Sequence, residues 1–293
     1  MRLSQLFNLA IKLGKERDPR KDKGAIKSYP DSALLYGRRD AEIKKFMVGI
    51  DIESAELLLA EKIREREGLD LVVAHHPEGS AFASLHEVMQ LQVELLKKMG
   101  VAEGLAQKLL DERMWEVERR ILPNNHSRAV DTARLLGMPF INLHTPADNH
   151  AFYFMQELMR KKKPAYVKDI VDILLEVPEY RRARQELVGP RIILGSPKRK
   201  VGKILVEMTG GTEGSRDVFD KLYRAGVRTL ICMHLSEDHL KKVKDASLNV
   251  VIAGHISSDT LGLNLLLDRL QKRSGERFEI IACSGFRRVI REK

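Results

Sequence analysis

The sequence predicts an α/β protein of two lobes, each built on a largely parallel sheet flanked by helices. In the second half of the chain, apolar runs of strand length alternate with segments of helical periodicity, as parallel strands joined by crossover helices require. Four of the apolar runs end directly on histidine. The chain has 293 residues, of which 43% are hydrophobic, so it can bury a large core.

In the first part of the chain, a strand is expected over 46–51 and a helix over 54–67, which Gly68 ends. The next apolar run ends at His75 and His76. Adjacent hydrophobic segments of this kind are typical of neighbouring strands with a helix between them.

A charge-rich segment over 85–120 carries apolar residues at helical spacing and predicts two or more helices. It separates the strand that ends at His76 from the strand that ends at His144. We therefore expect a helical insertion over about 78–125 in the first lobe. A helix over 127–136 then leads into the His144 strand.

A basic segment with three prolines, over about 160–191, predicts a helical connector. We therefore expect one domain of two lobes, the first over about 1–160 and the second over about 192–293. The expected strands of the second lobe are 203–208, 228–233 and 249–254, and its expected helices are 217–225, 236–246 and 259–272.

The composition limits the class of protein. Cys232 and Cys283 lack the paired spacing of zinc ribbons and disulfide frameworks, so both are expected to be buried thiols. No stretch reaches the roughly 20 apolar residues that span a bilayer, and the first residues lack a long apolar signal core. We therefore expect a cytoplasmic protein that does not associate with membranes.

The net charge of +10 suits an anionic partner, either a phosphorylated small molecule or a nucleic acid. Charge alone does not distinguish these partners. Aromatic residues make up only 5% of the chain, and no aromatic pair lies inside a basic run, which argues against a dedicated base-stacking surface.

The histidines at strand ends predict a metal centre. They are His75 with His76, His144, His234 and His255. The carboxyl ends of parallel strands line one crevice, and imidazole is the commonest protein ligand for transition metals. A carboxylate follows two of the histidines four residues later, Asp148 after His144 and Asp259 after His255.

Each candidate ligand also has an ordinary structural explanation. His75 and His76 would then be hydrogen-bonded loop histidines. Asp148 would cap a helix over 151–159 through its exposed amides. Asp259 would be stabilised by the dipole of the helix that it begins, without any metal.

Other polar features carry weaker predictions. His234 is expected to contact a substrate or support the ligands from just outside them, although ordinary placement in the crevice explains it nearly as well. The Gly-rich segment 209–215 could cradle an anion, but a tight turn is the simpler interpretation because it fits no phosphate-binding motif. His126 and His150 are expected on the surface.

Three motifs in this order resemble one family. They are His75-His76-Pro77, His144-Thr145-Pro146-Ala147-Asp148, and Gly254-His255-Ile256-Ser257-Ser258-Asp259, the last of which continues into Gly262 and a Leu-rich helix. The combination is similar to the YbgI/YqfO-like dinuclear metal-centre proteins, also called the NGG-interacting-factor-three-like family and regarded as type-two homologues of GTP cyclohydrolase I.

The resemblance implies a site for two divalent transition-metal ions, with His144 just outside the ligands. The implied ligands are His75, His76, Asp148, His255 and Asp259. Zinc, iron, manganese and nickel all suit His and carboxylate ligands. The acid after His255 is usually Glu in the family, so the shorter Asp259 could alter the distances or the metal preference. The first 45 residues match the family poorly and are assigned no role.

Two functions are compatible with this resemblance. One is a metal-dependent hydrolase of a nucleotide-like or phosphorylated small molecule, with Glu78 and His234 as candidates for the general acid or base. The alternative is a non-enzymatic metal carrier or a nucleic-acid-associated regulator. The resemblance also implies a homo-oligomer, a ring-like hexamer.

Overall fold

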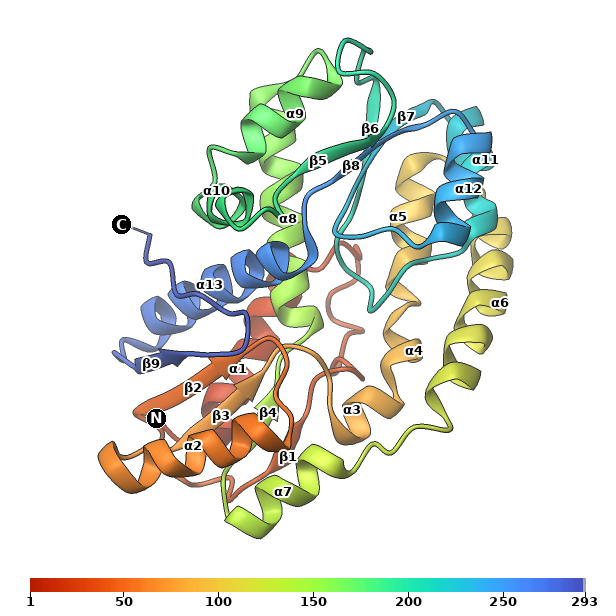
Figure 1. The fold of residues 1–293 in the computed structure, drawn as a ribbon. Coiled ribbons are helices and arrows are strands. Elements are labelled where there is room, and N and C mark those ends of the chain that lie inside the picture. Colours follow the sequence, from red (N-terminus) through yellow and green to blue (C-terminus); the bar gives the residue numbers. More distant parts are fainter. Residues whose placement is uncertain (292–293) are drawn as a thin grey trace.

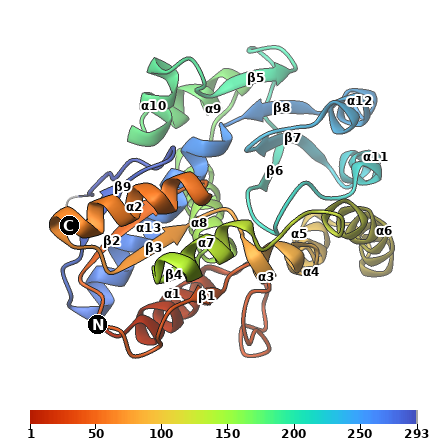
Figure 2. The same cartoon turned by 60° about the horizontal axis from the view of Figure 1, so that its bottom comes forward.

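The structure, a computed structural model, describes residues 1–291 and contains two sheets. The first has the order β1-β4-β3-β2-β9, with β1 (Leu34–Tyr36), β2 (Lys45–Gly49), β3 (Leu71–Ala74), β4 (Phe140–Asn142) and β9 (Glu279–Ala282). The second has the order β5-β8-β7-β6, with β5 (Arg191–Leu194), β6 (Lys203–Glu207), β7 (Val227–Cys232) and β8 (Asn249–Ile252). Figures 1 and 2 show the two sheets in separate lobes of one molecule.

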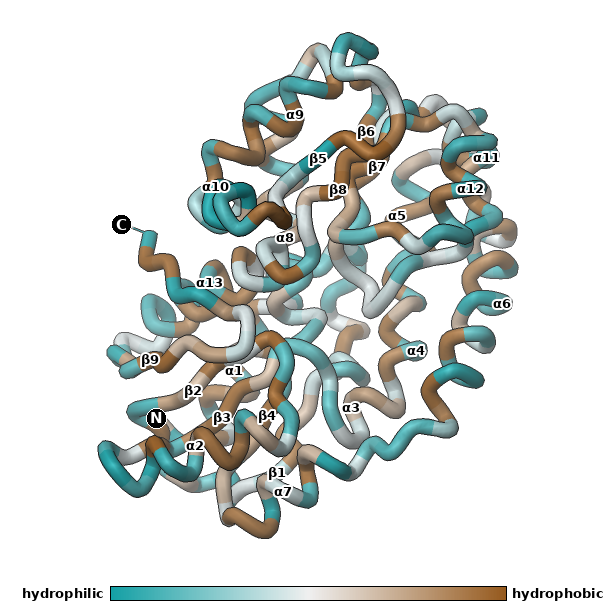
Figure 3. Tube along the Cα trace, viewed as in Figure 1, coloured by the Kyte–Doolittle hydropathy of each residue, from teal (hydrophilic) through white to brown (hydrophobic). Residues whose placement is uncertain are grey.

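The strands pair in parallel except at one edge of each sheet, where β1 and β5 run antiparallel to their neighbours. The predicted α/β class with largely parallel sheets is therefore confirmed. Figure 3 shows why these segments form buried strands, because β7 and β8 are coloured as hydrophobic along most of their length.

Helices cover the sheets and join them. They are α1 (Leu3–Arg17), α2 (Ser54–Glu67), α3 (Gly79–Ala83), α4 (Leu85–Val88), α5 (Leu91–Met99), α6 (Glu103–Ile121), α7 (Arg128–Leu136), α8 (Thr145–Lys162), α9 (Val167–Leu174), α10 (Pro178–Gln185), α11 (Phe219–Arg224), α12 (Glu237–Asp245) and α13 (His255–Ser274), with a short 3₁₀ helix at Arg216–Val218. Within residues 1–291, none of them has the length and apolar character needed to cross a bilayer.

The chain does not divide between the sheets where we expected. The end of the chain returns to the first sheet, because β9 pairs with β2 and α13 packs Leu263 and Leu266 into that sheet's core. The segment from 255 onward therefore returns to the first sheet, although Leu261 of α13 also packs with Ile231 and Val251 of the second. This pairing joins residues far apart in the sequence, and β9 is a half-exposed strand of four residues with little local signal.

The predicted insertion lies between β3 and β4 of the first sheet, but its helices pack against the second sheet. Met89 and Val93 share a hydrophobic core with Leu222 and Leu230. Figure 1 accordingly shows α5 and α6 beside α11 and α12. The insertion thus forms a wall that connects the two lobes.

Two helices begin earlier than predicted. We expected helices over 151–159 and 259–272, whereas α8 begins at Thr145 and α13 at His255. Pro146 suggested a turn, but proline is favoured in a first helical turn, where its missing N–H would have no partner. The early starts place the His and Asp of both motifs within one turn of helix.

Candidate metal centre

The centre forms where β3 and β4 end and where α8 and α13 begin. His75 and His76 directly follow β3, and His144 follows β4 at the residue before α8. The two carboxylates come from the helices, Asp148 from α8 and Asp259 from α13. Because β3 and β4 are parallel neighbours, their carboxyl ends bring these side chains to one edge of the sheet.

Asp259 lies between three histidines. Its Oδ1 is 3.5 Å from Nε2 of His75, and its Oδ2 is 3.5 Å from Nε2 of both His76 and His255. His255 is four residues before Asp259 on α13, so the two side chains lie on the same helix face.

Asp148 lies between two histidines. Its Oδ1 is 3.4 Å from Nε2 of His75, and its Oδ2 is 3.7 Å from Nε2 of His144. The structure thus brings together all five predicted ligands and adds His144. Two sets of three residues have ligand atoms close enough together to hold an ion. One set is His75, His76 and Asp259, and the other is His75, His144 and Asp148.

Four polar atoms of this centre are buried and have no hydrogen-bond partner among the described residues: Nε2 of His75, Oδ1 of Asp148, and both carboxylate oxygens of Asp259. Buried polar atoms are rarely left unpaired, because each costs about 1–3 kcal/mol.

The spacing of these atoms fits a metal better than it fits hydrogen bonds. Separations of 3.4–3.7 Å exceed the 2.7–3.2 Å of a good hydrogen bond. Two ligand atoms at roughly 2.0–2.2 Å from a tetrahedral ion lie about 3.4 Å from each other. The donor set of imidazole nitrogens and carboxylate oxygens therefore fits divalent transition-metal ions.

The opposite nitrogen of three of these histidines is already engaged. Nδ1 of His75 lies 3.3 Å from the carbonyl oxygen of Leu143, and Nδ1 of His76 lies 2.6 Å from Oδ1 of Asp51. An acceptor at Nδ1 fixes the proton there and leaves the lone pair on Nε2, which is the form that binds a metal.

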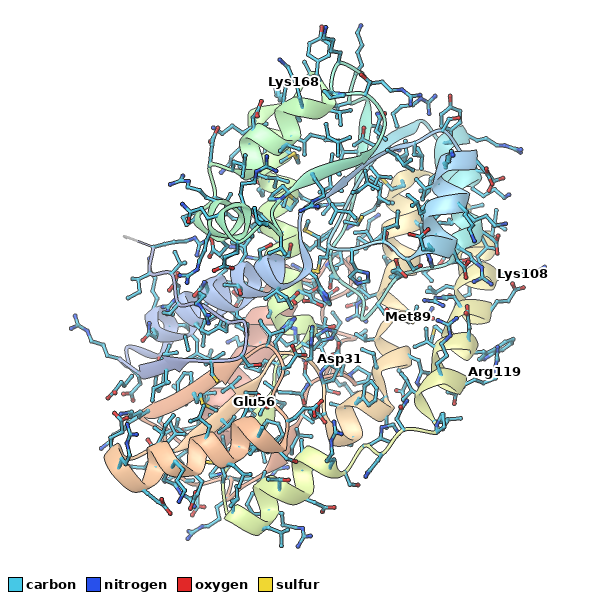
Figure 4. The ribbon with its side chains drawn as sticks, viewed as in Figure 1. Asp31, Glu56, Met89, Lys108, Arg119 and Lys168 are labelled. Atoms are coloured by element: carbon cyan, nitrogen blue, oxygen red, sulfur yellow. The ribbon has the colours of Figure 1, made fainter. Side chains whose placement is uncertain are left out.

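His144 has the same arrangement, because its Nδ1 donates to Oδ2 of Asp31 at 2.8 Å. Sequence reasoning missed both supporting carboxylates. Asp51 could have been found, since it comes soon after β2, next to the strand that carries His75. Asp31, labelled in Figure 4, is fully buried but lies in an N-terminal segment without a periodic pattern.

The charges of the centre hold protons where the metal would lie. Burial lowers the pKa of His75, but Asp259 and Asp148 outweigh it and raise the value to about 10. Burial likewise opposes protonation of His76, yet Asp259 and Asp51 raise its pKa to about 9. Burial would raise the pKa of Asp259, but the neighbouring His75 and His76 hold it well below its usual range.

A glycine sets the approach of the two helices that carry the carboxylates. A Cβ added at Gly262 of α13 would lie 2.4 Å from the backbone oxygen of Ala147 on α8. Because Ala147 precedes Asp148, the absence of a side chain at Gly262 lets the helices bring Asp148 and Asp259 together.

A cleft opens beside the centre, and the second lobe forms its other wall. His234 lines it, with its ring 4.7 Å from that of His255 and its Nδ1 3.7 Å from Glu213. The Glu213 carboxylate raises the pKa of His234. Glu78, the other candidate acid or base, does not line this cleft; burial and the nearby Glu53 raise its pKa to about 7.

The Gly-rich segment 209–215 is a turn in the wall of the cleft. Gln92 of α5 donates hydrogen bonds to the carbonyl oxygens of Gly210 and Thr212, at 2.8 and 2.7 Å. The inserted helices therefore fix the shape of this wall.

The surface prediction for His150 was wrong, because its side chain is buried and lies within hydrogen-bond distance of Pro146 and Arg269. The predicted helix began at residue 151 and so left His150 out, whereas α8 begins at Thr145 and carries His150 on its buried face. His126 is half-buried against Phe82.

Solved structures resemble this one over nearly the whole chain. A NIF3 superfamily protein from Sphaerobacter thermophilus is 30% identical with a TM-score of 0.82, and the match covers 96% of this chain and 97% of that one. Reduced HcgD from Methanocaldococcus jannaschii is 16% identical with a TM-score of 0.59, covering 96% and 97%. Protein ybgI, of unknown function, is 13% identical with a TM-score of 0.54, covering 97% and 98%.

The sequence matches no protein-family model and no curated protein. The likeness to HcgD and ybgI is evidence of fold alone. The Sphaerobacter protein combines fold with sequence, since the 30% identity extends over almost the full length of both chains. Together with the three motifs, this match shows that the chain belongs to the NIF3 superfamily.

Proposed function

We propose that this protein holds two divalent transition-metal ions and uses them to hydrolyse a nucleotide-like or phosphorylated small molecule. The observation that carries the proposal is the set of buried, unpartnered atoms on His75, Asp148 and Asp259. Bound cations would satisfy all of them at once, because each atom offers a lone pair when the histidine is neutral.

The contacts support one assignment of ligands to two ions. His75, His144 and Asp148 would hold one ion, and His76, His255 and Asp259 the other. In this assignment Asp259 could bridge the ions, because its two oxygens face different histidines. His144 is thereby proposed as a ligand and not only as a neighbour of the ligands.

Two such ions would lower the pKa of a water between them and stabilise charge that develops on the attacked and leaving atoms. The protein's own part is to orient the imidazoles through Asp31 and Asp51, which accept hydrogen bonds at Nδ1. His234 lines the cleft next to His255, where it would contact a bound substrate.

The first test is elemental analysis of protein purified without an affinity tag or added metal. We expect about two transition-metal ions per chain, zinc, iron, manganese or nickel, and fewer in His255→Ala. His126→Ala is the matched control and should keep its metal, because His126 lies outside the centre. Metal-free protein that also fails to bind added zinc, iron or manganese would overturn the proposal.

A hydrolase and a metal carrier are then separated by turnover. With the identified metal bound, a hydrolase should act on at least one compound of a panel of nucleotides and phosphorylated metabolites, and His255→Ala should lose that activity. A carrier should transfer its metal readily to a chelator and show no turnover. A nucleic-acid-associated regulator should bind nucleic acid with a strong dependence on salt.

We also propose, from the family resemblance, that the chain forms a homo-oligomer, a ring-like hexamer. Light scattering during size-exclusion chromatography should give six times the mass of one chain. A monomeric mass at micromolar concentration would contradict this proposal. The cytoplasmic location stays a prediction.

A further inference from the structure

The wall of the cleft that faces the metal centre is acidic and rich in sulfur. The second lobe contributes Glu207, Met208, Glu213, Cys232, Met233 and His234. None of the described residues that line the cleft is Lys or Arg. His234 is paired with Glu213, so an anionic group placed against this wall would meet two carboxylates with no Lys or Arg to balance them.

The two glutamates keep free capacity to accept hydrogen bonds. Glu207 ends β6, and its Oε1 accepts the N–H of Gly214 at 3.2 Å. Glu213 accepts the N–H of Ser236 through Oε1 at 2.6 Å. A carboxylate offers roughly four acceptor positions, so each glutamate has room for further N–H donors.

The environment of Glu207 favours a cationic neighbour. Burial raises its pKa, and the charge of Glu213 adds to this effect. Burial would also raise the pKa of Glu213, but His234 and the N–H of Ser236 lower it to about 2, so Glu213 is charged at neutral pH. A positively charged group between the two would offset the cost of keeping both ionised.

The same cleft reaches the candidate metal centre. Asp259 lines it, is 1% exposed, and has two unpartnered oxygens. Glu207 and Glu213 therefore line the same cleft as the buried carboxylate that we assign to the metal ions, so one ligand in this cleft would reach both.

We propose that the cleft binds a substrate whose far end carries several N–H donors, such as an amidine, a guanidine or an amino-substituted heterocycle. Glu207 and Glu213 would accept these donors, while Met208 and Met233 pack against the flat group. This inference rests on the proposed function, because the metal ions would bind the reacting end of the same substrate. The inference adds that the protein recognises the other end of the substrate through its N–H donors and not through a phosphate group.

Benzamidine and benzoate test the inference, because they have nearly the same shape and opposite charge. Each compound would be titrated into metal-loaded protein, and binding would be followed by NMR. The proteins compared are the unmodified protein, the variants Glu207→Gln and Glu213→Gln, and the control Glu237→Gln. Glu237 is exposed on α12, so this control removes the same charge outside the cleft.

We expect benzamidine to bind the unmodified protein and Glu237→Gln equally, and to bind Glu207→Gln or Glu213→Gln at least about tenfold more weakly. Benzoate should not be weakened by either substitution. Equal benzamidine affinity in all four proteins, or no benzamidine binding at all, would overturn the inference.

Metal content measured on the same samples separates this result from the proposed function. Loss of benzamidine binding in Glu207→Gln with two ions still bound supports the cleft assignment. If every sample lacks metal, the proposal of a dinuclear centre is overturned. In that case, the comparison of benzamidine binding between the glutamate variants and the unmodified protein still tests the cleft assignment.

Discussion

The Asp31 carboxylate accepts a hydrogen bond from Nδ1 of His144 at 2.8 Å, across 113 positions of sequence. The Thr145 hydroxyl donates to the same carboxylate oxygen at 2.6 Å, and the backbone N–H of His144 donates to the Ser32 hydroxyl at 3.0 Å. These contacts fix the imidazole plane and leave Nε2 facing Asp148. The N-terminal segment is therefore part of the candidate metal centre, although no role was predicted for it.

Replacing Asp31 should weaken metal binding without removing a ligand. In Asp31→Asn the side chain loses the charge that makes the imidazole of His144 a stronger base, so we expect affinity for zinc to fall by about 10- to 100-fold. Competition against a chromophoric chelator measures this. Asp40→Asn is the control, since Asp40 is an exposed carboxylate that pairs with Arg38. Equal zinc affinity in Asp31→Asn and the unmodified protein would show that Asp31 does not support a ligand.

Metal binding should release protons. Because the pKa values of His75 and His76 are raised to about 10 and about 9, both imidazoles are protonated at pH 7 in the metal-free protein. A metal binds the neutral form, so about two protons per chain should leave at pH 7, and apparent affinity should rise with pH until roughly pH 9–10. Calorimetric titration in two buffers of different ionisation enthalpy measures the release. Affinity that stays flat between pH 6 and 9 would contradict this assignment of charge.

Local patterns predicted the strands of the centre, and nonlocal contacts explain what was missed. The runs that end at His75 and His144 are fully buried, so their apolar character is visible in the sequence. The contact between Asp31 and His144 depends on packing, and no spacing rule connects such distant positions. The return of β9 to the first sheet is hidden for the same reason.

The chemistry of single residues explains the misplaced helix starts. Pro146 was interpreted as a helix breaker, although it occupies the first turn of α8. At the other motif, Gly254 has a φ of +111°, which ends the extended run and lets α13 begin at His255. The structure brings the residues of the three motifs together, but their positions on the helices became clear only from these backbone details.

His150 should make the protein sensitive to acid. Arg269 donates to Nε2 of His150, so Nδ1 carries the proton and donates to the carbonyl oxygen of Pro146 at 2.7 Å. Burial lowers the pKa of His150 from 6.5 to about 3. Below pH 6.5 the unfolded chain binds a proton here that the folded protein does not, so stability is lost as the pH falls from 6.5 toward 3.

The measurement is urea unfolding of metal-free protein at several pH values. In His150→Gln, which has no group to protonate at this position, the free energy of unfolding should fall less between pH 6.5 and 4 than in the unmodified protein. Each protein is compared with its own value at pH 7, which removes the general cost of the substitution. Identical losses in the two proteins would mean that His150 is not held neutral.

Gly262→Ala should destabilise the fold and the metal centre together. The added Cβ would lie 2.4 Å from the backbone oxygen of Ala147, so α13 must move away from α8. We expect a loss of about 1–3 kcal/mol in the free energy of unfolding, as for other overpacked sites, and weaker zinc binding because Asp148 and Asp259 separate. Gly104→Ala, in the first turn of α6, is the matched control: a Cβ there meets nothing within 4 Å, so this substitution should not destabilise the fold. Unfolding of the metal-free proteins and zinc competition measure the two effects separately. If Gly262→Ala binds zinc as tightly as Gly104→Ala, the close contact of α8 and α13 does not set the spacing of the two carboxylates.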